Sequence, residues 1–413
     1  MKQHSDKLFF KHPNMTTYLV TGGAGFIGAN FVKYLLKLHG SNINIIILDS
    51  LTYAGNLMTI KGELELPNVS FIKGDIGDAE IVSKILSENN IDFIVNFAAE
   101  SHVDRSITNP RLFLETNILG THNMLECARK AWLIGKDSHC KYLYKGGKKF
   151  LQISTDEVYG SLEKDFDSAH ELNVTPEIKK VIGSRTDMKT FGDKYFTETT
   201  PLSPRSPYSA SKTSADMIAV AYHETYNFPI NITRCSNNYG PYHFPEKLIP
   251  LIIKNILEGK KLPVYGKGEN VRDWLYVEDH AKGIEMVLRK GQIGEVYNIG
   301  GFNEESNINI VKEVIALIAQ IMRKEPKYQS LLKCTIDDIN NNLIEFVADR
   351  PGHDMRYAMD PTKIATKLGW YPETSFKEGI RKTIHWYLDN QDWVENVTSG
   401  DYQKYYESMY SGR

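Results

Sequence analysis

Short apolar runs alternate with helical patterns through the first two thirds of the chain. The runs are apolar on both faces of a strand, and the segments between them repeat apolar residues at helical spacing. This alternation is typical of a parallel sheet covered by helices on both sides, the doubly wound α/β architecture. The predicted strands are residues 16–22, 42–49, 69–75, 91–99, 148–155 and 229–237, and the predicted helices are residues 26–38, 110–132 and 207–226.

The pattern becomes less regular in the last third of the chain. Several Gly and Pro turns interrupt it, and one long helix is predicted near Ile308–Met322. We therefore predict a Rossmann-type doubly wound domain over residues 15–240. We predict that a smaller C-terminal lobe takes most of residues 241–413, with some of its segments returning to the first domain.

Three segments look peripheral to this core. Residues 1–14 are polar and lack the apolar stretch of a secretory signal, so we interpret them as an extension, with Met15 as an alternative start. The segment from about residue 135 to 149 is rich in turn residues and basic. The segment from about residue 162 to 194 is charged and shows no clear helix or strand period. We interpret these two insertions, which flank the strand at 148–155, as solvated loops, with a lid or an oligomer contact as the alternative.

Composition narrows the class of protein. The 413 residues are 41% hydrophobic and 24% charged, which is ordinary for a globular chain. A formal net charge of −2 argues against nucleic-acid binding, and no apolar run is long enough for a membrane span. The cysteines form no CxxC pair, which argues against a disulfide framework or a zinc cluster. We expect a cytoplasmic protein with no metal site and no nucleic-acid or membrane partner.

A glycine-rich turn, TGGAGFIG over residues 21–28, lies between the first predicted strand and the first predicted helix. Its glycines let the backbone approach a pyrophosphate, and the helix N-terminus supplies free N–H groups. Asp49 ends the second strand, where a carboxylate can bind both ribose hydroxyls and would repel a 2′-phosphate. The sequence therefore predicts a site for NAD rather than NADP. Asp75, which ends the third strand, is a candidate for the adenine amino group or a plain turn residue.

Tyr208 and Lys212 lie four residues apart near the start of a predicted helix, so they share one face. An ammonium beside a phenol favours the phenolate and should lower the pKa of Tyr208. Such a tyrosine can remove a hydroxyl proton while hydride leaves the same carbon for NAD. Thr155 ends the strand at 148–155, and Asp156 and Glu157 follow it, at the sheet edge where ligands bind in this architecture. An acid and a base side by side favour an elimination.

The glycine-rich turn and the Tyr208–Lys212 pair together resemble the extended branch of the short-chain dehydrogenase/reductase superfamily. This resemblance implies that the C-terminal lobe is a substrate-binding lobe for a nucleotide sugar. Within that branch the chain resembles the dTDP-glucose 4,6-dehydratase family from Met15 to about Trp393, apart from the two insertions. Nine stretches carry the resemblance in order: TGGAGFIG, DSLTYAGN, FAAESHVDRSI, STDEVYG, SPYSASK, CSNNYGPYHFPEKLIP, LPVYGKGENVRDWLYVEDHA, YNIGGFNE and VADRPGHDMRY.

The resemblance implies a redox-neutral cycle on a nucleotide sugar. Tyr208 would take the proton of the sugar 4-hydroxyl as hydride leaves C4, Thr155 would hydrogen-bond the 4-oxygen, and Lys212 would hold the nicotinamide ribose. Glu157 would remove the C5 proton, and Asp156 would protonate the departing 6-hydroxyl. To donate a proton near neutrality Asp156 needs a raised pKa, which burial and Glu157 could both provide. Hydride would then return to C6, and C5 would be reprotonated.

The resemblance also implies the binding residues and a homodimer formed through the helices near 110–132 and 207–226. Arg272 and Asn237 would meet the pyrophosphate, and Pro263 to Tyr265 would line the base pocket. The predicted cofactor contacts are Gly22, Gly25, Phe26, Ile27, Gly28, Asp49, Ser50, Leu51, Thr52, Asp75, Ile76, Phe97, Ala98, Ala99, Ser101, Thr116, Tyr208, Lys212 and Asn238. The predicted substrate contacts are Ser101, Thr155, Asp156, Glu157, Asn237, Lys247, Leu248, Pro263, Val264, Tyr265, Arg272, Asn307, Asp349, Arg350, His353 and Tyr357.

Alternative functions remain at this point. A nucleotide-sugar 4-epimerase or a UDP-glucuronate decarboxylase would keep the glycines, Tyr208 and Lys212, but neither needs the Asp156–Glu157 pair in this form. The same dehydration on UDP-glucose or another sugar nucleotide is a closer alternative, because one thymine methyl offers a discrimination of only about 1–3 kcal/mol. A non-catalytic NAD-binding sensor is compatible with the fold alone, but a sensor has no need of the catalytic set.

Overall fold

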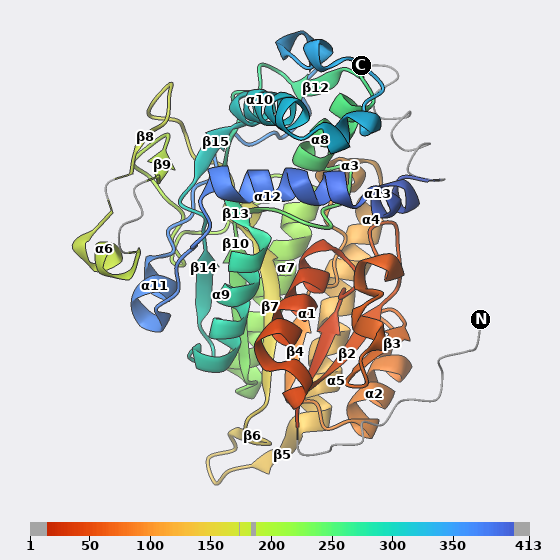
Figure 1. Cartoon of the computed structure of the whole chain (residues 1–413). Helices are drawn as coiled ribbons and strands as arrows, with labels where there is room; N and C mark the ends of the chain where they lie inside the picture. Colours follow the sequence, from red (N-terminus) through yellow and green to blue (C-terminus); the bar gives the residue numbers. More distant parts are fainter. Residues whose placement is uncertain (1–14, 173, 183–186, 400–413) are drawn as a thin grey trace.

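The computed structural model describes residues 15–172, 174–182 and 187–399. The predicted N-terminal extension lies outside the described residues. Seven parallel strands form a central sheet, in the order β14-β10-β7-β4-β1-β2-β3 (Figure 1). The strands are β1 (Thr16–Thr21), β2 (Ile43–Asp49), β3 (Val69–Lys73), β4 (Phe93–Asn96), β7 (Lys149–Thr155), β10 (Ile230–Cys235) and β14 (Val296–Ile299). The predicted doubly wound parallel sheet is confirmed, and β14 adds a strand from the irregular last third.

The apolar strands bury both of their faces because helices cover the sheet on each side. Val20 and Ile47 face one helical layer, whereas Leu19 and Ile46, the residues just before them on the same strands, face the other. The first layer contains α1 (Phe26–His39), α9 (Val277–Lys290) and α11 (Thr362–Leu368). The second layer contains α2 (Ala79–Glu88), α5 (Thr121–Trp132) and α7 (Pro207–Tyr226). The two-residue period of the strands thus produces the three-layer arrangement.

The helix predicted over residues 110–132 is divided into three parts. α4 (Pro110–Phe113) continues into a π-helix, η4 (Leu114–Gly120), and then into α5. Gly120 ends the π-helical part, and a Cβ there would lie 2.8 Å from the side chain of Ile76. Within η4, Asn117 donates to the Ser211 hydroxyl on α7, 2.8 Å away. Through this hydrogen bond, η4 contacts α7, the helix that carries Tyr208 and Lys212.

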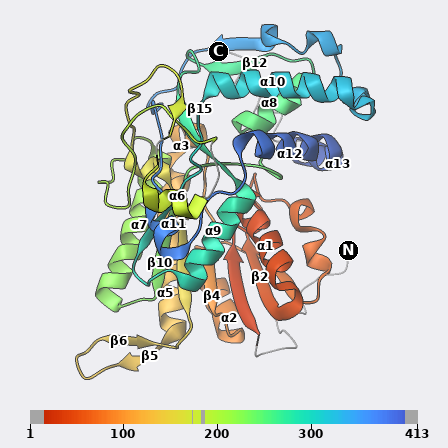
Figure 2. The same cartoon turned by 60° about the vertical axis from the view of Figure 1, so that its left-hand side comes forward.

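The C-terminal lobe lies above the carboxyl ends of the sheet strands (Figures 1 and 2). Its own apolar core contains Ile252, Val314 and Ile380 from three helices. The helices of the lobe are α8 (Leu248–Leu257), α10 (Asn307–Lys324), α12 (Phe376–Asp389) and α13 (Gln391–Val397). The short strands of the lobe are β11 (Asn237–Tyr239), β12 (Leu262–Tyr265), β13 (Val271–Tyr276), β15 (Glu304–Ser306) and β16 (Ile344–Val347). α10 contains the long helix predicted near Ile308–Met322.

The two insertions contain more secondary structure than their sequences predict. The first forms a hairpin of β5 (Leu133–Lys136) and β6 (Tyr142–Tyr144), which projects from the end of the sheet opposite the lobe (Figure 1). The second contains β8 (His170–Glu171), α6 (Pro176–Ile182) and β9 (Lys189–Thr190). Ile178 of α6 packs with Phe302 and with Ala365 of α11. These apolar partners are remote in the chain, so no local period reveals the packing.

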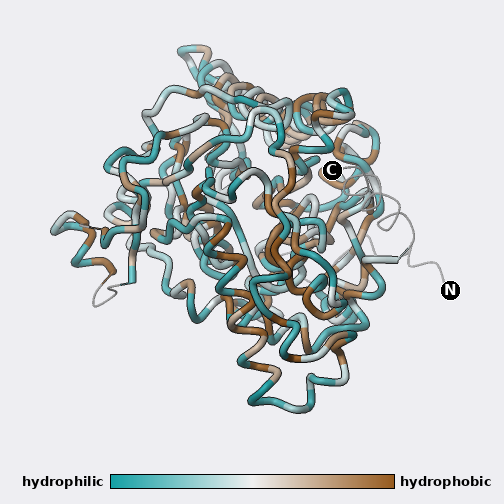
Figure 3. Tube along the Cα trace, turned by 90° about the horizontal axis from the view of Figure 1, so that it is seen from above, coloured by the Kyte–Doolittle hydropathy of each residue, from teal (hydrophilic) through white to brown (hydrophobic). Residues whose placement is uncertain are grey.

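The distribution of hydrophobic and hydrophilic residues along the chain agrees with this layered architecture. Seen from above, hydrophobic stretches run through the middle of the trace and most outlying loops are hydrophilic (Figure 3). Across the described ranges, no helix combines the length and the apolar character needed to cross a bilayer.

Candidate active site

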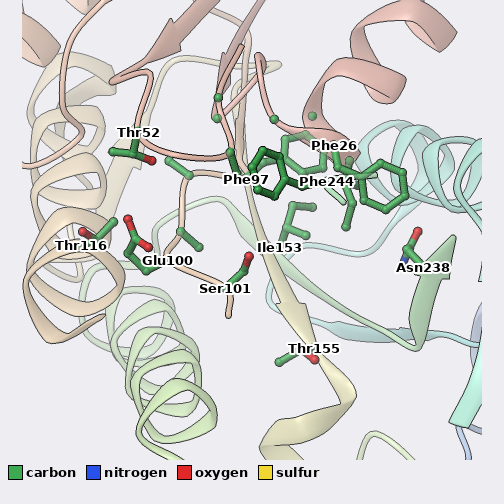
Figure 4. A pocket seen from close by; sticks show the side chains of 18 of the residues that line it. Phe26, Thr52, Phe97, Glu100, Ser101, Thr116, Ile153, Thr155, Asn238 and Phe244 are labelled. Atoms are coloured by element: carbon green, nitrogen blue, oxygen red, sulfur yellow. The ribbon is translucent and has the colours of Figure 1, made fainter. Parts of the chain in front are cut away.

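A cavity of about 400 Å³ lies where the carboxyl ends of the sheet strands meet the lobe. All five predicted catalytic residues line it, together with the predicted cofactor residues other than Leu51. In Figure 4, Thr155 lies at the end of β7, and Thr116 and Glu100 lie on the opposite side of the view from Asn238. Residues that are widely separated in the sequence are therefore gathered around one space.

The glycine-rich turn is shaped by close backbone contacts. Gly22 has φ of +65°, and a Cβ there would lie 2.8 Å from the Ala98 nitrogen. A Cβ at Gly28 would lie 2.3 Å from the Gly22 carbonyl oxygen. Only glycine fits these positions without a shift, and the turn leads directly into the N-terminus of α1. Free N–H groups at this terminus suit an anionic pyrophosphate.

Asp49 is held at the end of β2 by two backbone amides. Its carboxylate accepts from the Ala24 N–H at 3.0 Å and from the Leu51 N–H at 2.8 Å. Leu51 thus supports Asp49 through its backbone instead of lining the cavity. Burial raises the pKa of Asp49, and these two amide hydrogen bonds oppose the rise. An oriented carboxylate beside a glycine cradle fits the adenosine ribose and pyrophosphate of NAD.

The end of β7 places two carboxylates in the cavity. Thr155 caps a short 3₁₀ turn, η5 (Asp156–Tyr159), by accepting from the Glu157 N–H at 3.3 Å. The Thr155 hydroxyl in turn donates to the Asp156 carboxylate at 3.0 Å. The turn directs consecutive side chains into one site, and Asp156 is buried whereas Glu157 is partly exposed.

The surroundings of the two carboxylates differ. Burial raises the pKa of Asp156 well above its ordinary value, and the neighbouring Glu157 raises it further. Burial also raises the pKa of Glu157, but Arg350, Arg272 and Lys247 oppose that rise. Asp156 therefore tends to keep its proton, while Glu157 is surrounded by cations that favour its ionised form.

Tyr208 and Lys212 lie on the first two turns of α7, which starts with Pro207 and a capping box between Ser206 and Ser209. Both side chains are buried, and the Lys212 ammonium donates to the Ile153 carbonyl at 2.7 Å. The structure differs from the expectation for Tyr208. Burial, followed by the charge of Glu157, raises the pKa of Tyr208, and burial lowers the pKa of Lys212. The protein groups alone thus favour a protonated phenol.

A buried polar network lies behind these residues. Asp216, one turn beyond Lys212, accepts from the Arg234 Nε at 2.9 Å and from the Ser154 hydroxyl at 3.0 Å. Arg234 also donates to the Tyr159 hydroxyl at 2.9 Å. These bonds link α7, β7 and β10, so the helix with Tyr208 and Lys212 is fixed against the strand with the two carboxylates.

The predicted substrate residues divide into two groups. Ser101, Asn237, Lys247 and Leu248 line the cavity together with the catalytic carboxylates and Thr155. The remaining predicted residues do not line it. They lie on β12, β13 and α10 or in the connection between β16 and α11: Pro263, Val264, Tyr265, Arg272, Asn307, Asp349, Arg350, His353 and Tyr357.

The predicted substrate residues that do not line the cavity still contact one another and act on the charge of Glu157. Arg272 stacks over the Tyr357 ring, with 4.2 Å from its guanidinium carbon to the ring centre, and donates to the Asp354 carbonyl at 3.1 Å. The His353 Nδ1 lies 2.6 Å from the Asp349 carboxylate. The charges of Arg272 and Arg350 act on Glu157, which places both cations near the catalytic end of the cavity.

Several cavity residues were not predicted from the sequence. Tyr53, Glu100, Glu246 and Phe244 line the cavity and lie inside stretches that carry the family resemblance. Cys235, at the end of β10, also lines it. The only sequence feature that could have indicated these residues is their position inside the matched stretches. Buried acidic and aromatic side chains have no distinctive spacing that marks them as site residues.

Comparisons with known proteins agree with this geometry. The model of the NAD dependent epimerase/dehydratase family matches residues 18–300. A dTDP-glucose 4,6-dehydratase of Shigella flexneri is 47% identical over 395 residues, covering 96% of this chain and 99% of the relative.

Two solved structures are also similar. The dTDP-glucose 4,6-dehydratase of Bacillus anthracis in complex with NAD is 42% identical with a TM-score of 0.73, over 92% of this chain and 99% of that chain. The dTDP-glucose 4,6-dehydratase of Streptomyces venezuelae, also with NAD bound, is 39% identical with a TM-score of 0.75, over 92% of this chain and 100% of that chain.

Proposed function

The chain belongs to the NAD dependent epimerase/dehydratase family and, within it, to the dTDP-glucose 4,6-dehydratases, and we propose that it converts dTDP-glucose to dTDP-4-keto-6-deoxyglucose and water. One observation carries the proposal: Asp156 and Glu157 share a cavity with Tyr208, Lys212 and the glycine-rich turn. Oxidation and reduction at C4 need only a tyrosine–lysine pair, whereas loss of water also needs a base at C5 and an acid at the 6-hydroxyl.

The protonation tendencies support a division of roles between the carboxylates. Asp156, whose pKa is raised by burial and by Glu157, would protonate the departing 6-hydroxyl. Glu157, whose ionised form is favoured by three nearby cations, would remove the C5 proton. Environments that separate the pKa values of two neighbouring carboxyls are a general means of assigning acid and base.

The first proton transfer falls to Tyr208, which would accept the proton of the sugar 4-hydroxyl. Thr155 would hydrogen-bond the same oxygen, and Lys212, fixed on Ile153, would orient the cofactor ribose. When bound, NAD supplies the hydride acceptor for C4 and the hydride donor for C6 within one turnover. Because the raised pKa of Tyr208 favours the phenol, proton removal at C4 is the step that most depends on the complete complex.

Nucleotide-sugar binding is assigned to the boundary between cavity and lobe. Lys247, Arg272 and Arg350 bring three positive charges close to Glu157, as an anionic diphosphate requires. Pro263 to Tyr265 on β12 would line the base pocket. The names of the relatives favour the thymidine nucleotide over UDP-glucose.

We also propose a homodimer and a cytoplasmic location. Apolar side chains are exposed on adjacent helices, with Leu114 and Leu119 on η4 and Met217 on α7. A second copy of the chain would cover this surface. Cys127, Cys140, Cys235 and Cys334 are all free, as is usual in a reducing compartment.

Mass spectrometry of the purified protein tests the proposed reaction. The protein would be incubated separately with dTDP-glucose and with UDP-glucose, without added NAD. Loss of one water from the dTDP sugar is the expected result and also indicates retained cofactor. Loss only from the UDP sugar would overturn the base assignment, and no loss from either sugar, even with NAD supplied, would contradict the proposal.

A further inference from the structure

The segment of residues 101–105 runs along the boundary between the sheet domain and the lobe. It follows β4 and leads into α3 (Val103–Thr108). Its backbone and charged side chains contact groups of the lobe that the proposed function assigns to substrate. We call residues 101–105 the boundary segment.

Two contacts of the boundary segment reach the start of α8. The Arg105 Nε and one terminal nitrogen of its guanidinium donate to the Glu246 carboxylate at 3.3 and 3.1 Å. The Lys247 ammonium donates to the Ser101 carbonyl at 3.2 Å. Lys247 is thereby held between its own helix and the boundary segment.

Asp104 makes two further contacts with the lobe. The Tyr265 hydroxyl of β12 donates to one oxygen of its carboxylate at 3.1 Å. A guanidinium nitrogen of Arg350 lies 3.5 Å from the other oxygen. Asp104 is 8% exposed, so this charge is buried and is compensated by side chains from two separate parts of the lobe.

The backbones of both partners are held without Asp104. Tyr265 pairs with Val347 in the parallel ladder of β12 and β16. The segment after Arg350 is bound to β13, where the Val271 N–H donates to the Met355 carbonyl at 2.8 Å. Asp104 therefore determines where the ends of two long side chains lie, rather than whether the lobe forms.

We propose that Asp104 is a positioning residue for nucleotide-sugar binding, which holds Tyr265 toward the base and Arg350 toward the diphosphate. The inference rests on the proposed function, because the roles of Tyr265 and Arg350 come from it. Holding the two side chains in place before the ligand arrives removes an ordering cost from binding. Arg350 also lies among cations near Glu157, and the Asp104 carboxylate offsets that repulsion.

Asp104→Asn tests the proposal because it removes the charge and keeps the shape. The KM for dTDP-glucose should rise about tenfold, the factor expected for the loss of one charge-assisted contact. The kcat, the bound NAD and the unfolding temperature should stay close to those of the wild type. An unchanged KM would overturn the proposal, and so would a joint fall in kcat, NAD content and stability.

Asp92→Asn is the matched control. Asp92 is also a carboxylate paired with a cation, with the Lys148 ammonium at 2.8 Å, but it precedes β4 at the other end of the sheet. This variant should leave the KM for dTDP-glucose unchanged. A rise in its KM equal to that of Asp104→Asn would show a general loss of stability and overturn the proposal.

A double-mutant cycle with Tyr265→Phe tests the specific contact. Removal of the hydroxyl alone should raise the KM about threefold. The double variant Asp104→Ala/Tyr265→Phe should be no worse than Asp104→Ala alone, because alanine leaves the phenol no acceptor and both changes break the same hydrogen bond. Independent, multiplying effects would contradict the coupling. If Asp104→Asn does not fold, an unchanged KM in Tyr265→Phe alone would overturn the proposal.

The affinity for dTDP, measured by calorimetry on the wild type and on Asp104→Asn, tests the positioning role independently of the proposed reaction. A wild type that turns over no dTDP-glucose would defeat the proposed function. Weaker dTDP binding by Asp104→Asn than by the wild type would still support the positioning role. Equal affinity of the two proteins would defeat that role even if the dehydratase reaction is observed.

Discussion

At the scale of single residues, the consecutive carboxylates Asp156 and Glu157 differ through their surroundings rather than their chemistry. Thr155 donates to one of them, and three cations surround the other. We expect Glu157→Gln to stop exchange of the C5 proton with solvent while reduction of bound NAD remains observable. Asp156→Asn should allow that exchange but slow water loss by about 10²–10⁴-fold, the usual contribution of a general acid. Mass spectrometry in heavy water measures both steps.

Glu157→Gln and Asp156→Asn serve as controls for one another, because each replaces one of two neighbouring carboxylates by an amide. Water loss at the wild-type rate in Asp156→Asn would show that Asp156 is not the acid. Rapid C5 exchange in Glu157→Gln would show that another group is the base.

The pKa of Asp156 also predicts a pH dependence of stability. Its folded-state pKa is raised, by burial first, so the protonated form is stable in the folded protein and the stabilisation is lost as pH rises through that pKa. The amide introduced by Asp156→Asn has no such proton to lose. We therefore expect this variant to unfold at a higher temperature than the wild type at neutral pH, with the difference vanishing below pH of about 4, where an unfolded aspartate is also protonated. A constant difference across the pH range would contradict this account.

The residues that the sequence predicts as catalytic all line one cavity, and so does most of the predicted cofactor set. Asp49, Tyr208 and Lys212 could be predicted because they lie at a strand end or near a helix start with a recognisable spacing, whereas Thr116 and Asn238 came only from the family resemblance.

The sequence did not predict the direction of the Tyr208 pKa. The spacing of Tyr208 and Lys212 shows one neighbouring cation, whereas the folded chain adds burial and the charge of Glu157, which lies on η5 after β7. Glu246 and Tyr53 were missed for a related reason, since only the tertiary arrangement brings them to the cavity.

At the scale of elements, the connection between β1 and α1 depends on the absence of side chains. Gly28→Ala would place a Cβ 2.3 Å from the Gly22 carbonyl, so the turn must open. We expect this variant to purify with little bound NAD, as measured by the nucleotide released on denaturation. Gly62→Ala is its control, because a Cβ there meets nothing within 4 Å. Equal NAD content in the two variants would contradict the role given to the turn.

Elements that the sequence predicted well are those with a strong local period, such as β2 and α7. β14 was missed because it is four residues long and is recognised only by its ladder with β10, where Val296 pairs with Ile232. The insertion helix α6 was missed because Ile178 acquires an apolar environment only against Phe302 and Ala365. In both cases the information lies in contacts between distant segments.

At the scale of the whole molecule, the exposed apolar surface on η4 and α7 supports the proposed homodimer. Leu119 is 61% exposed, and Met217 on the neighbouring helix is 44% exposed. We expect Leu119→Glu to convert the dimer to a monomer, since a buried unpaired carboxylate in each copy would oppose association. Light scattering gives the molar mass. Ile134→Glu, at a similarly exposed residue of the β5–β6 hairpin, should remain a dimer, and the loss of the dimer in this control alone would relocate the interface.

The central claim is that hydride leaves C4 and returns to C6 within one turnover while Asp156 and Glu157 remove water. Its most direct test is turnover of dTDP-glucose deuterated at C4, with the position of the label in the product determined by mass spectrometry and NMR. We predict a product that has lost one water and carries the deuterium at C6. Deuterium retained at C4 without water loss, or exchanged into solvent, would contradict the account.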